Sequence, residues 1–328
     1  MSQLTTPLPS PTDKHSKTNE NIRLFRQYRE LFRNQLPGFF IPENKVKLFV
    51  FRLLWLQIRP QCFIIKEIES KEENCMKYYE QLLEIGCFTR DELCTLTGNY
   101  DTAGTVLKNY MKKGYVKNVK RNLYVAVNLA DRQPVANKQR IAGKITPTAY
   151  VSHHAAFEYY GCANQVSYQV EVSSMTPFAT FSFDGLVFMY IASRIKDGVT
   201  TRPDGVRVTD MERTVIDGIH DFEKVAGLEE LLRCISLVPS VREDKLLAYL
   251  ASYGKQVLYQ KTGYILRHYQ RAFDLSDAFF SECAAQIGKS TRYLTGNNDG
   301  IYNGEWRLVV PPDLMKITSK GMASDAGL

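Results

Sequence analysis

Residues 99–122 have the types and spacing that contacts with nucleic acid require. In "NYDTAGTVLKNYMKKG" the apolar residues recur at the helical period on one face, and hydroxyl, amide and lysine side chains occupy the opposite face. Short polar side chains can approach base edges in a major groove, and lysines can reach the flanking phosphates. The next segment, "GYVKNVKRNLYVAVN", predicts a hairpin with a cationic loop from Lys117 to Asn122. The residues that we expect to contact a duplex are Thr105, Lys108, Asn109, Lys112, Lys117, Lys120 and Arg121.

Short helices must position this face, and the preceding sequence contains the signals for them. An apolar stripe over residues 79–85 ends at a glycine, and Thr89 followed by Glu92 predicts a capping box that opens a second helix. Asn99 can cap the third helix. Three short helices followed by a basic hairpin are typical of a winged helix-turn-helix, which we predict over residues 76–129.

The distribution of charge favours a phosphate-bearing partner for the front of the chain. Residues 1–75 carry 12 Lys/Arg and 8 Asp/Glu, residues 76–150 carry 12 and 6, and residues 151–328 carry 18 and 21. A basic front joined to a slightly acidic body is typical of a protein whose front end meets nucleic acid. With 44% hydrophobic and 23% charged residues, the 328-residue chain falls outside the disordered and fibrous classes.

The cysteines and the longest apolar stretch indicate the compartment. The seven cysteines are scattered without a Cys-x-x-Cys spacing, which indicates neither a disulfide framework nor a zinc site and favours the reducing cytoplasm. The most apolar stretch, residues 46–65, is interrupted by Lys47, Arg52 and Arg59, so no run reaches the ~20 residues of a spanning helix. We therefore predict a cytoplasmic protein with no membrane partner.

The first 75 residues form a poorly patterned extension. Residues 1–20 have the composition of a disordered segment, and residues 21–75 show no clean period. The codons of residues 71–73 can form a purine run that resembles a bacterial ribosome-binding site shortly before Met76. We expect Met76 to be the natural start, with a genuine basic arm as the alternative. Mass spectrometry of the protein made from its native locus decides between them.

The rest of the chain mixes strands and helices. Residues 130–147 predict a linker with a short helix that has Pro134 in its first turn, and residues 148–328 predict a larger domain. Alternating runs separated by turn residues predict an antiparallel sheet from residues 168–174, 179–183 and 186–191. Helical patterns and a last strand follow. The fold class that we predict is α+β, with an N-terminal winged helix-turn-helix followed by a larger mixed α/β C-terminal domain.

The helix predicted after Thr209 has the clearest sequence signals in the body. Thr209 and Glu212 predict a second capping box, and Arg213 and Asp217 lie one turn apart, where they can pair. A catalytic role for these acids is conceivable. Because each charged residue here has a local structural explanation, we favour the structural interpretation.

Two further groups could do chemistry, and both have a structural explanation. His154 and Glu158 lie one turn apart after His153, but no third metal ligand stands at a useful spacing. Residues 243–245, Glu-Asp-Lys, match the Glu-x-Lys motif of a common nuclease core. That core needs the motif on a strand, whereas here the pattern predicts that it begins a helix. The chain also lacks a glycine-rich phosphate loop and a Gly-x-Ser-x-Gly motif. We predict no enzyme activity, no cofactor and no metal site.

Several segments in this order resemble the AbiEi family of antitoxins from type IV toxin-antitoxin (abortive infection) systems. The segments are "KYYEQLLEIGCFTRDELCTLTGN", "YMKKGYVKNVKRNLYVAVN", "AYVSHHAAFEYYGCANQ", "RVTDMERTVIDGI", "GLEELLRC" and "YQKTGYILRHY". The resemblance covers Met76 to the region of Leu314 and leaves the first 75 residues unmatched.

The resemblance implies a cytoplasmic antitoxin that represses its own operon. Its winged helix would bind inverted repeats in double-stranded DNA of its own promoter, and its C-terminal domain would oppose a nucleotidyltransferase toxin encoded beside it, without a stable complex. The DNA-reading role of the family falls on the seven residues named above.

Two other functions remain open at this point. A winged-helix regulator with a ligand-sensing C-terminal domain predicts a well-formed apolar pocket in the body and no toxin gene next door. A DNA-targeted nuclease predicts clustered acids on a strand.

Overall fold

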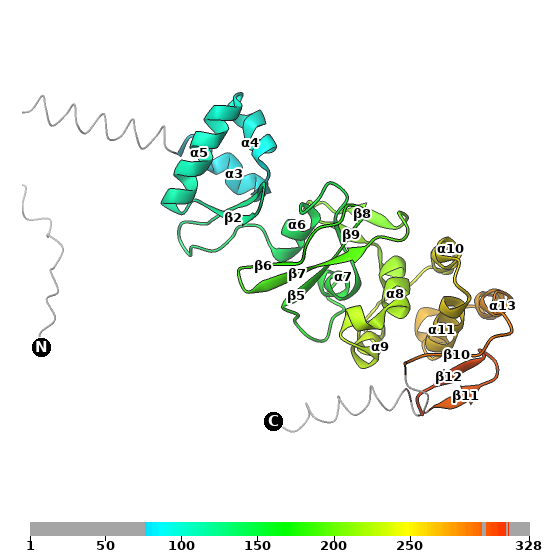
Figure 1. The fold of residues 1–328 in the computed structure, drawn as a ribbon. Helices are drawn as coiled ribbons and strands as arrows, with labels where there is room; N and C mark the ends of the chain where they lie inside the picture. The colour runs from blue at the N-terminus through cyan, green and yellow to red at the C-terminus, as the bar shows by residue number, and fades with distance from the viewer. Residues whose placement is uncertain (1–75, 297–299, 313, 315–328) are drawn as a thin grey trace, which may run out of the picture. The chain divides into compact units, whose positions relative to one another are not determined.

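The computed structural model describes residues 76–296, 300–312 and 314, so the expectations for the first 75 residues lie outside the described residues. Within the described ranges the protein is mixed α+β, with three separate sheets (Figure 1). No helix in this part of the chain is long and apolar enough to cross a membrane.

The first module consists of three helices and a three-stranded antiparallel sheet of order β1-β3-β2. Its elements are α3 (Tyr79–Ile85), β1 (Cys87–Phe88), α4 (Arg90–Thr97), α5 (Tyr100–Lys113), β2 (Val116–Lys120) and β3 (Leu123–Ala126). The predicted capping box is confirmed, because the Thr89 side chain accepts from the Glu92 N–H and the Glu92 carboxylate accepts from the Thr89 N–H. Asn99 caps α5 as predicted. These local hydrogen bonds fix where each helix begins, and hence which residues of α5 face outward.

The hairpin β2-β3 contributes to the packing of the body as well as to its own module. Val119, Leu123 and Val125 share one buried apolar cluster with Val170 and Phe188 of the body. The hairpin is therefore anchored on the side that faces this cluster.

A short helix follows the hairpin, close to where the sequence predicts one. Helix α6 (Lys138–Gly143) begins after Asn137, whose side chain accepts from the Arg140 N–H. Pro134 lies outside the helix and forms an isolated bridge with Val127. The side-chain cap, rather than the proline, sets the start of α6.

A six-stranded sheet of order β6-β7-β5-β4-β9-β8 lies at the centre of the body. Its strands are β4 (Tyr150–Val151), β5 (Gln169–Ser174), β6 (Phe181–Phe183), β7 (Leu186–Ala192), β8 (Val199–Thr201) and β9 (Arg207–Thr209). The predicted turn at Asp184-Gly185 joins β6 to β7 as an antiparallel pair, with positive φ at both turn residues. The prediction of a purely antiparallel sheet is wrong, because β7 lies between β6 and β5 and runs parallel to β5. Alternation in the sequence shows which segments are extended, but not which strand edges meet.

Helices cover this sheet and continue beyond it to a small second sheet (Figure 1). The helices are α7 (His153–Tyr159), α8 (Met211–His220), the 3-10 turn η1 (Phe222–Val225), α9 (Leu228–Ser236), α10 (Glu243–Tyr253), α11 (Gln256–Arg267), α12 (Gln270–Phe273) and α13 (Asp277–Ala285). The small sheet has the order β10-β12-β11 and consists of β10 (Arg292–Tyr293), β11 (Ile301–Asn303) and β12 (Leu308–Val310). Trp306, two residues before β12, is fully buried in the apolar core that these helices share.

Replacing Gly263 in α11 by alanine should lower the free energy of unfolding by about 1–3 kcal/mol or more, because an added Cβ would overlap the buried indole ring of Trp306. Gly104→Ala in α5 is the matched control, since its Cβ would meet only the guanidinium end of Arg90, which can move away. That control should be neutral or stabilising by up to about 1 kcal/mol through helix propensity. Urea unfolding of the three proteins measures the difference, and equal stabilities of the two variants would contradict the packing of α11.

The buried carboxyl group of Glu171 on β5 should make the stability of the body depend on pH. Burial raises the pKa of Glu171 to about 7, and its Oε2 accepts from the Ala155 N–H at 3.0 Å. Because the pKa in the folded state lies above the ~4.3 of an unfolded chain, the stabilisation is complete below about pH 4.3 and is lost as the pH rises through about 7. From about pH 5 to pH 8 the free energy of unfolding of the wild type should fall by about 3 kcal/mol relative to that of Glu171→Gln, whose side chain cannot titrate. Urea unfolding of both proteins across this range checks the prediction, and a constant difference would contradict it.

Candidate functional site

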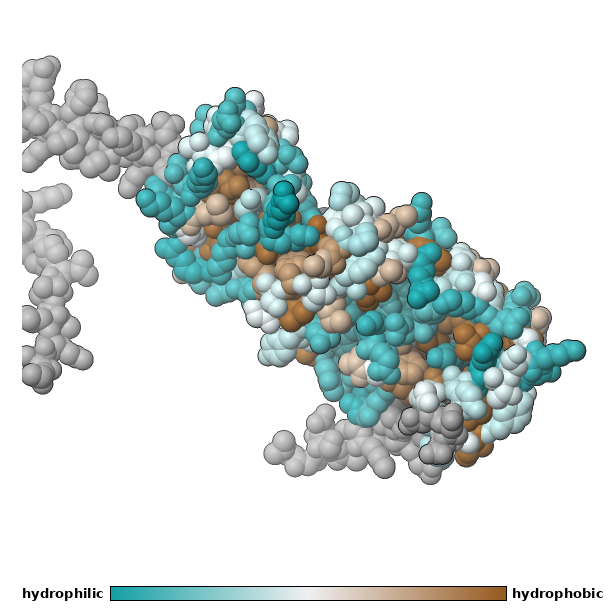
Figure 2. Space-filling view, in the orientation of Figure 1, coloured by the Kyte–Doolittle hydropathy of each residue, from teal (hydrophilic) through white to brown (hydrophobic). Residues whose placement is uncertain are grey.

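The outward face of α5 carries four of the seven residues expected to contact DNA. Thr105, Lys108, Asn109 and Lys112 are all exposed, and the two lysines lie one helical turn apart. The Thr105 hydroxyl donates to the Asp101 carbonyl oxygen at 3.0 Å, so its proton is already used within the helix. In Figure 2 the surface over α4 and α5 is largely hydrophilic, with small apolar patches. The structure thus brings these four side chains together on one helix surface.

The cationic hairpin differs from its prediction in length. The expected Lys117–Asn122 loop is wrong, because β2 continues to Lys120 and the turn consists of Arg121 and Asn122, with Asn122 at φ 60°. Val119 is buried, and the register of β2 against β3 shifts between Asn118 and Lys120. Arg121 is exposed at this turn.

Two lysines of the hairpin contact the body of the protein. Lys117 Nζ pairs with Asp184 at 3.4 Å. Lys120 Nζ lies 5.3 Å from the ring centroid of Phe178 and 5.6 Å from that of Phe181, and burial lowers its pKa. Because these contacts direct both ammonium groups toward the body, we remove Lys117 and Lys120 from the set expected to meet DNA.

The start of α8 also corrects the sequence analysis. Asp210, not Thr209, is the N-cap, and its Oδ1 accepts from the Arg213 N–H at 2.9 Å. Glu212 does not close a capping box but accepts from the Arg242 N–H at 3.1 Å. Thr209 is the last residue of β9, so its backbone still belongs to the sheet and the helix begins after it.

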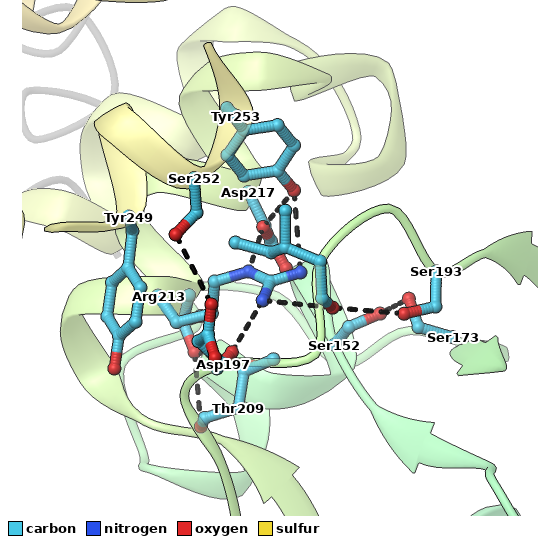
Figure 3. A network of polar contacts seen from close by, with 12 residues as sticks. Ser152, Ser173, Ser193, Asp197, Thr209, Arg213, Asp217, Tyr249, Ser252 and Tyr253 are labelled. Carbon is cyan, nitrogen blue, oxygen red and sulfur yellow. Dashed lines mark hydrogen bonds and ion pairs between the residues drawn. The ribbon is translucent and has the colours of Figure 1, made fainter. Parts of the chain in front are cut away.

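Arg213 and Asp217 form the predicted pair, but deep inside the body rather than at its surface. Arg213 Nε donates to Asp217 Oδ1 at 2.6 Å, and the two side chains are 2% and 1% exposed (Figure 3). Arg213 also donates to the carbonyl oxygens of Ile195 and Asp197, and the Tyr253 hydroxyl donates to Asp217 Oδ1 at 2.5 Å. Helix α8 is thus tied to the connection after β7 and to α10.

A small polar pocket of about 220 Å³ opens beside this pair. It is lined by His153, Ser173, Tyr190, Ile191, Ala192, Ser193, Arg194, Arg213, Asp217, His220, Asp221, Lys224 and Tyr253. Burial, and next the positive charge of Lys255, lower the pKa of His220 to about 4, so its imidazole is neutral near pH 7 and accepts from Lys255 Nζ at 2.8 Å. His153 has a φ of 50°, which is uncommon outside glycine. Such a lining can hold a small polar group by hydrogen bonds and charge.

The sequence analysis did not predict this pocket, because its residues form no local sequence motif. Its residues come from β5, β7 and the connection after it, α7, α8, η1 and α10, and only the fold brings them together. The nearest signal was the Arg213–Asp217 spacing, which predicted the pair but not the pocket.

A larger cavity of about 750 Å³ lies along α10, α11 and α13. Glu243 opens α10, as predicted, and lines this cavity together with Leu247, Tyr259 and Phe279. Its lining mixes charged, polar and apolar side chains, whereas the ligand-sensing regulator predicts a well-formed apolar pocket in the body. The triplet at residues 243–245 lies on a helix, so the geometry of the nuclease core is not formed there.

Comparison with known proteins identifies the fold but not the activity. No model of a protein family matches the chain, and no curated protein matches it. The chain is similar to a solved structure described as the crystal structure of RV2827C protein from Mycobacterium tuberculosis, with a TM-score of 0.52 and 12% sequence identity. The match covers 77% of this chain and 94% of that one. At this identity the likeness concerns the fold alone.

Proposed function

We propose that this protein is a DNA-binding antitoxin and autorepressor of a type IV toxin-antitoxin operon. In this proposal α3 to β3 act as a winged helix-turn-helix, α5 enters a major groove of the promoter, and the body opposes a neighbouring nucleotidyltransferase toxin without a stable complex. The observation that carries the proposal is the outward face of α5, where hydroxyl, amide and two lysine side chains are exposed together. The operon and the toxin enter this proposal through the resemblance of the sequence to the AbiEi family.

The proposed DNA contacts differ in their roles. Lys108, Lys112 and Arg121 are suited to phosphates, which position the protein without reading sequence. Asn109 is suited to a base edge, because a side-chain amide can bond an adenine in two places, and the Thr105 hydroxyl oxygen can still accept a hydrogen bond from a base. Catalysis has no place in this proposal, and neither does a cofactor.

The proposal has two separate tests on the full chain. Fluorescence anisotropy with promoter DNA from the native locus should show binding that prefers its inverted repeats over a scrambled duplex of equal length. Co-expression of the full chain with the neighbouring toxin should restore growth. If the first test fails, the protein is not a repressor of this promoter. If the second fails, it is not an antitoxin against this toxin.

A ligand-responsive regulator is the competing function, and the two cavities of the body are where its ligand would bind. The adjacent gene discriminates between the two functions. A neighbouring reading frame with a nucleotidyltransferase signature favours the antitoxin, and its absence favours the regulator.

A further inference from the structure

Three potential metal ligands meet inside the body. They are His154 near the start of α7, and Glu230 and Cys234, which lie one turn apart on α9. Their ligand atoms all lie within 4.8 Å of one another, and all three residues are buried. His154 Nε2 is 3.5 Å from Glu230 Oε1, and Cys234 Sγ is 3.6 Å from the same oxygen.

These separations match those between ligands of one tetrahedral zinc ion. With zinc bonds of about 2.0 Å to nitrogen or oxygen and about 2.3 Å to sulfur, tetrahedral geometry places neighbouring ligand atoms roughly 3.3–3.8 Å apart. The two measured distances fall inside this interval. These two contacts already have the spacing that a shared ion requires, and the ligand atoms of His154 and Cys234 lie within 4.8 Å of each other.

Buried polar atoms at this place lack the hydrogen bonds that a purely structural cluster would provide. Neither ring nitrogen of His154 has a hydrogen-bond partner among the described residues, and Glu230 Oε2 has none either. Their side chains are only 3% and 4% exposed. Leaving such groups buried without partners is destabilising, and more so when they are charged.

The carboxylate of Glu230 is also held in a fixed orientation. Its Oε1 accepts from the backbone N–H groups of Asn164 and Gln165, at 3.0 and 3.2 Å. Support of this kind around a ligand is typical of metal sites. Glu158, the partner that sequence spacing suggests for His154, instead pairs with Lys138 at 2.6 Å.

We propose that His154, Glu230 and Cys234 bind one Zn²⁺ ion through Nε2, a carboxylate oxygen and the thiolate sulfur. Imidazole and thiolate together suit zinc among the common divalent ions, and the two anionic ligands balance its charge. Three protein ligands leave one tetrahedral position for a water molecule or a further thiolate. The ion would join α7 to α9, two segments far apart in the sequence. This inference does not depend on the proposed function.

The test uses the purified full chain, freed of metal by dialysis against a chelator. Titration with Co²⁺ should give one bound ion per chain and a thiolate-to-cobalt charge-transfer band in the near ultraviolet, and Zn²⁺ should displace the cobalt. Cys234→Ser should lose this band and bind Co²⁺ at least roughly 100-fold more weakly. Cys283→Ser, which changes another fully buried cysteine of the same apolar core, should keep both band and affinity.

A simple ion pair between His154 and Glu230 is the alternative, and it predicts different results. It predicts no cobalt band, no gain in melting temperature on adding Zn²⁺, and the same destabilisation by Glu230→Gln with or without zinc. Any of these three results, or an unchanged band in Cys234→Ser, would overturn the proposal. If Cys234→Ser does not fold, the wild-type spectrum and metal content still decide the question.

Discussion

Replacing Asp217 by alanine should lower the free energy of unfolding by about 3–5 kcal/mol, because it leaves the buried Arg213 guanidinium without its counter-charge. Arg213 is 2% exposed and donates to Asp217 Oδ1 at 2.6 Å. The carbonyl oxygens of Ile195 and Asp197 that Arg213 also contacts offer hydrogen bonds but no negative charge. Urea unfolding followed by circular dichroism measures the loss.

The chain offers a matched control for this effect. Arg233 and Glu229 on α9 have the same one-turn spacing, and Nη2 of Arg233 lies 2.6 Å from Glu229 Oε1, but Glu229 is 53% exposed. Glu229→Ala should therefore change stability by less than about 1 kcal/mol. If Asp217→Ala and Glu229→Ala were equally mild, the buried pair would not be an essential contact of the body.

The double substitution Lys108→Ala/Lys112→Ala should weaken promoter binding about equally on all sequences. Each lysine lost from a phosphate contact reduces the slope of log K against log salt by about one unit, so we expect a change of about two units. At physiological salt this corresponds to a loss of affinity of roughly 30-fold. Fluorescence anisotropy at several salt concentrations measures both quantities.

Lys117→Ala/Lys120→Ala is the control for net charge, because it removes the same charge from the same module. Both ammonium groups contact the body, through Asp184 and through Phe178 and Phe181. The control should change the salt slope by much less than two units. If the control weakened binding as strongly as the α5 variant, the loss would follow from the net charge of the module and would not show that α5 makes the phosphate contacts.

The sequence predicted well those features that depend on neighbouring residues. The caps of α4 and α5, the outward residues of α5, and the Arg213–Asp217 pair all follow from residues within about four positions of one another. At that range the hydrogen bonds and the helical period are set by local chain geometry, so side-chain types and spacing are sufficient.

The parts that the sequence could not predict depend on which distant segments pack together. Parallel pairing of β5 with β7 and the contacts of Lys117 and Lys120 with the body are set by the packing of the whole sheet. His154 looked like half of an incomplete ligand pair, because its neighbours in space lie more than seventy positions along the chain on α9. The sequence by itself determined the caps of α4 and α5 and the polar face of α5, since these depend on local geometry. Only the tertiary structure decided which lysines stay exposed and which buried polar groups meet, because burial and proximity arise from long-range packing.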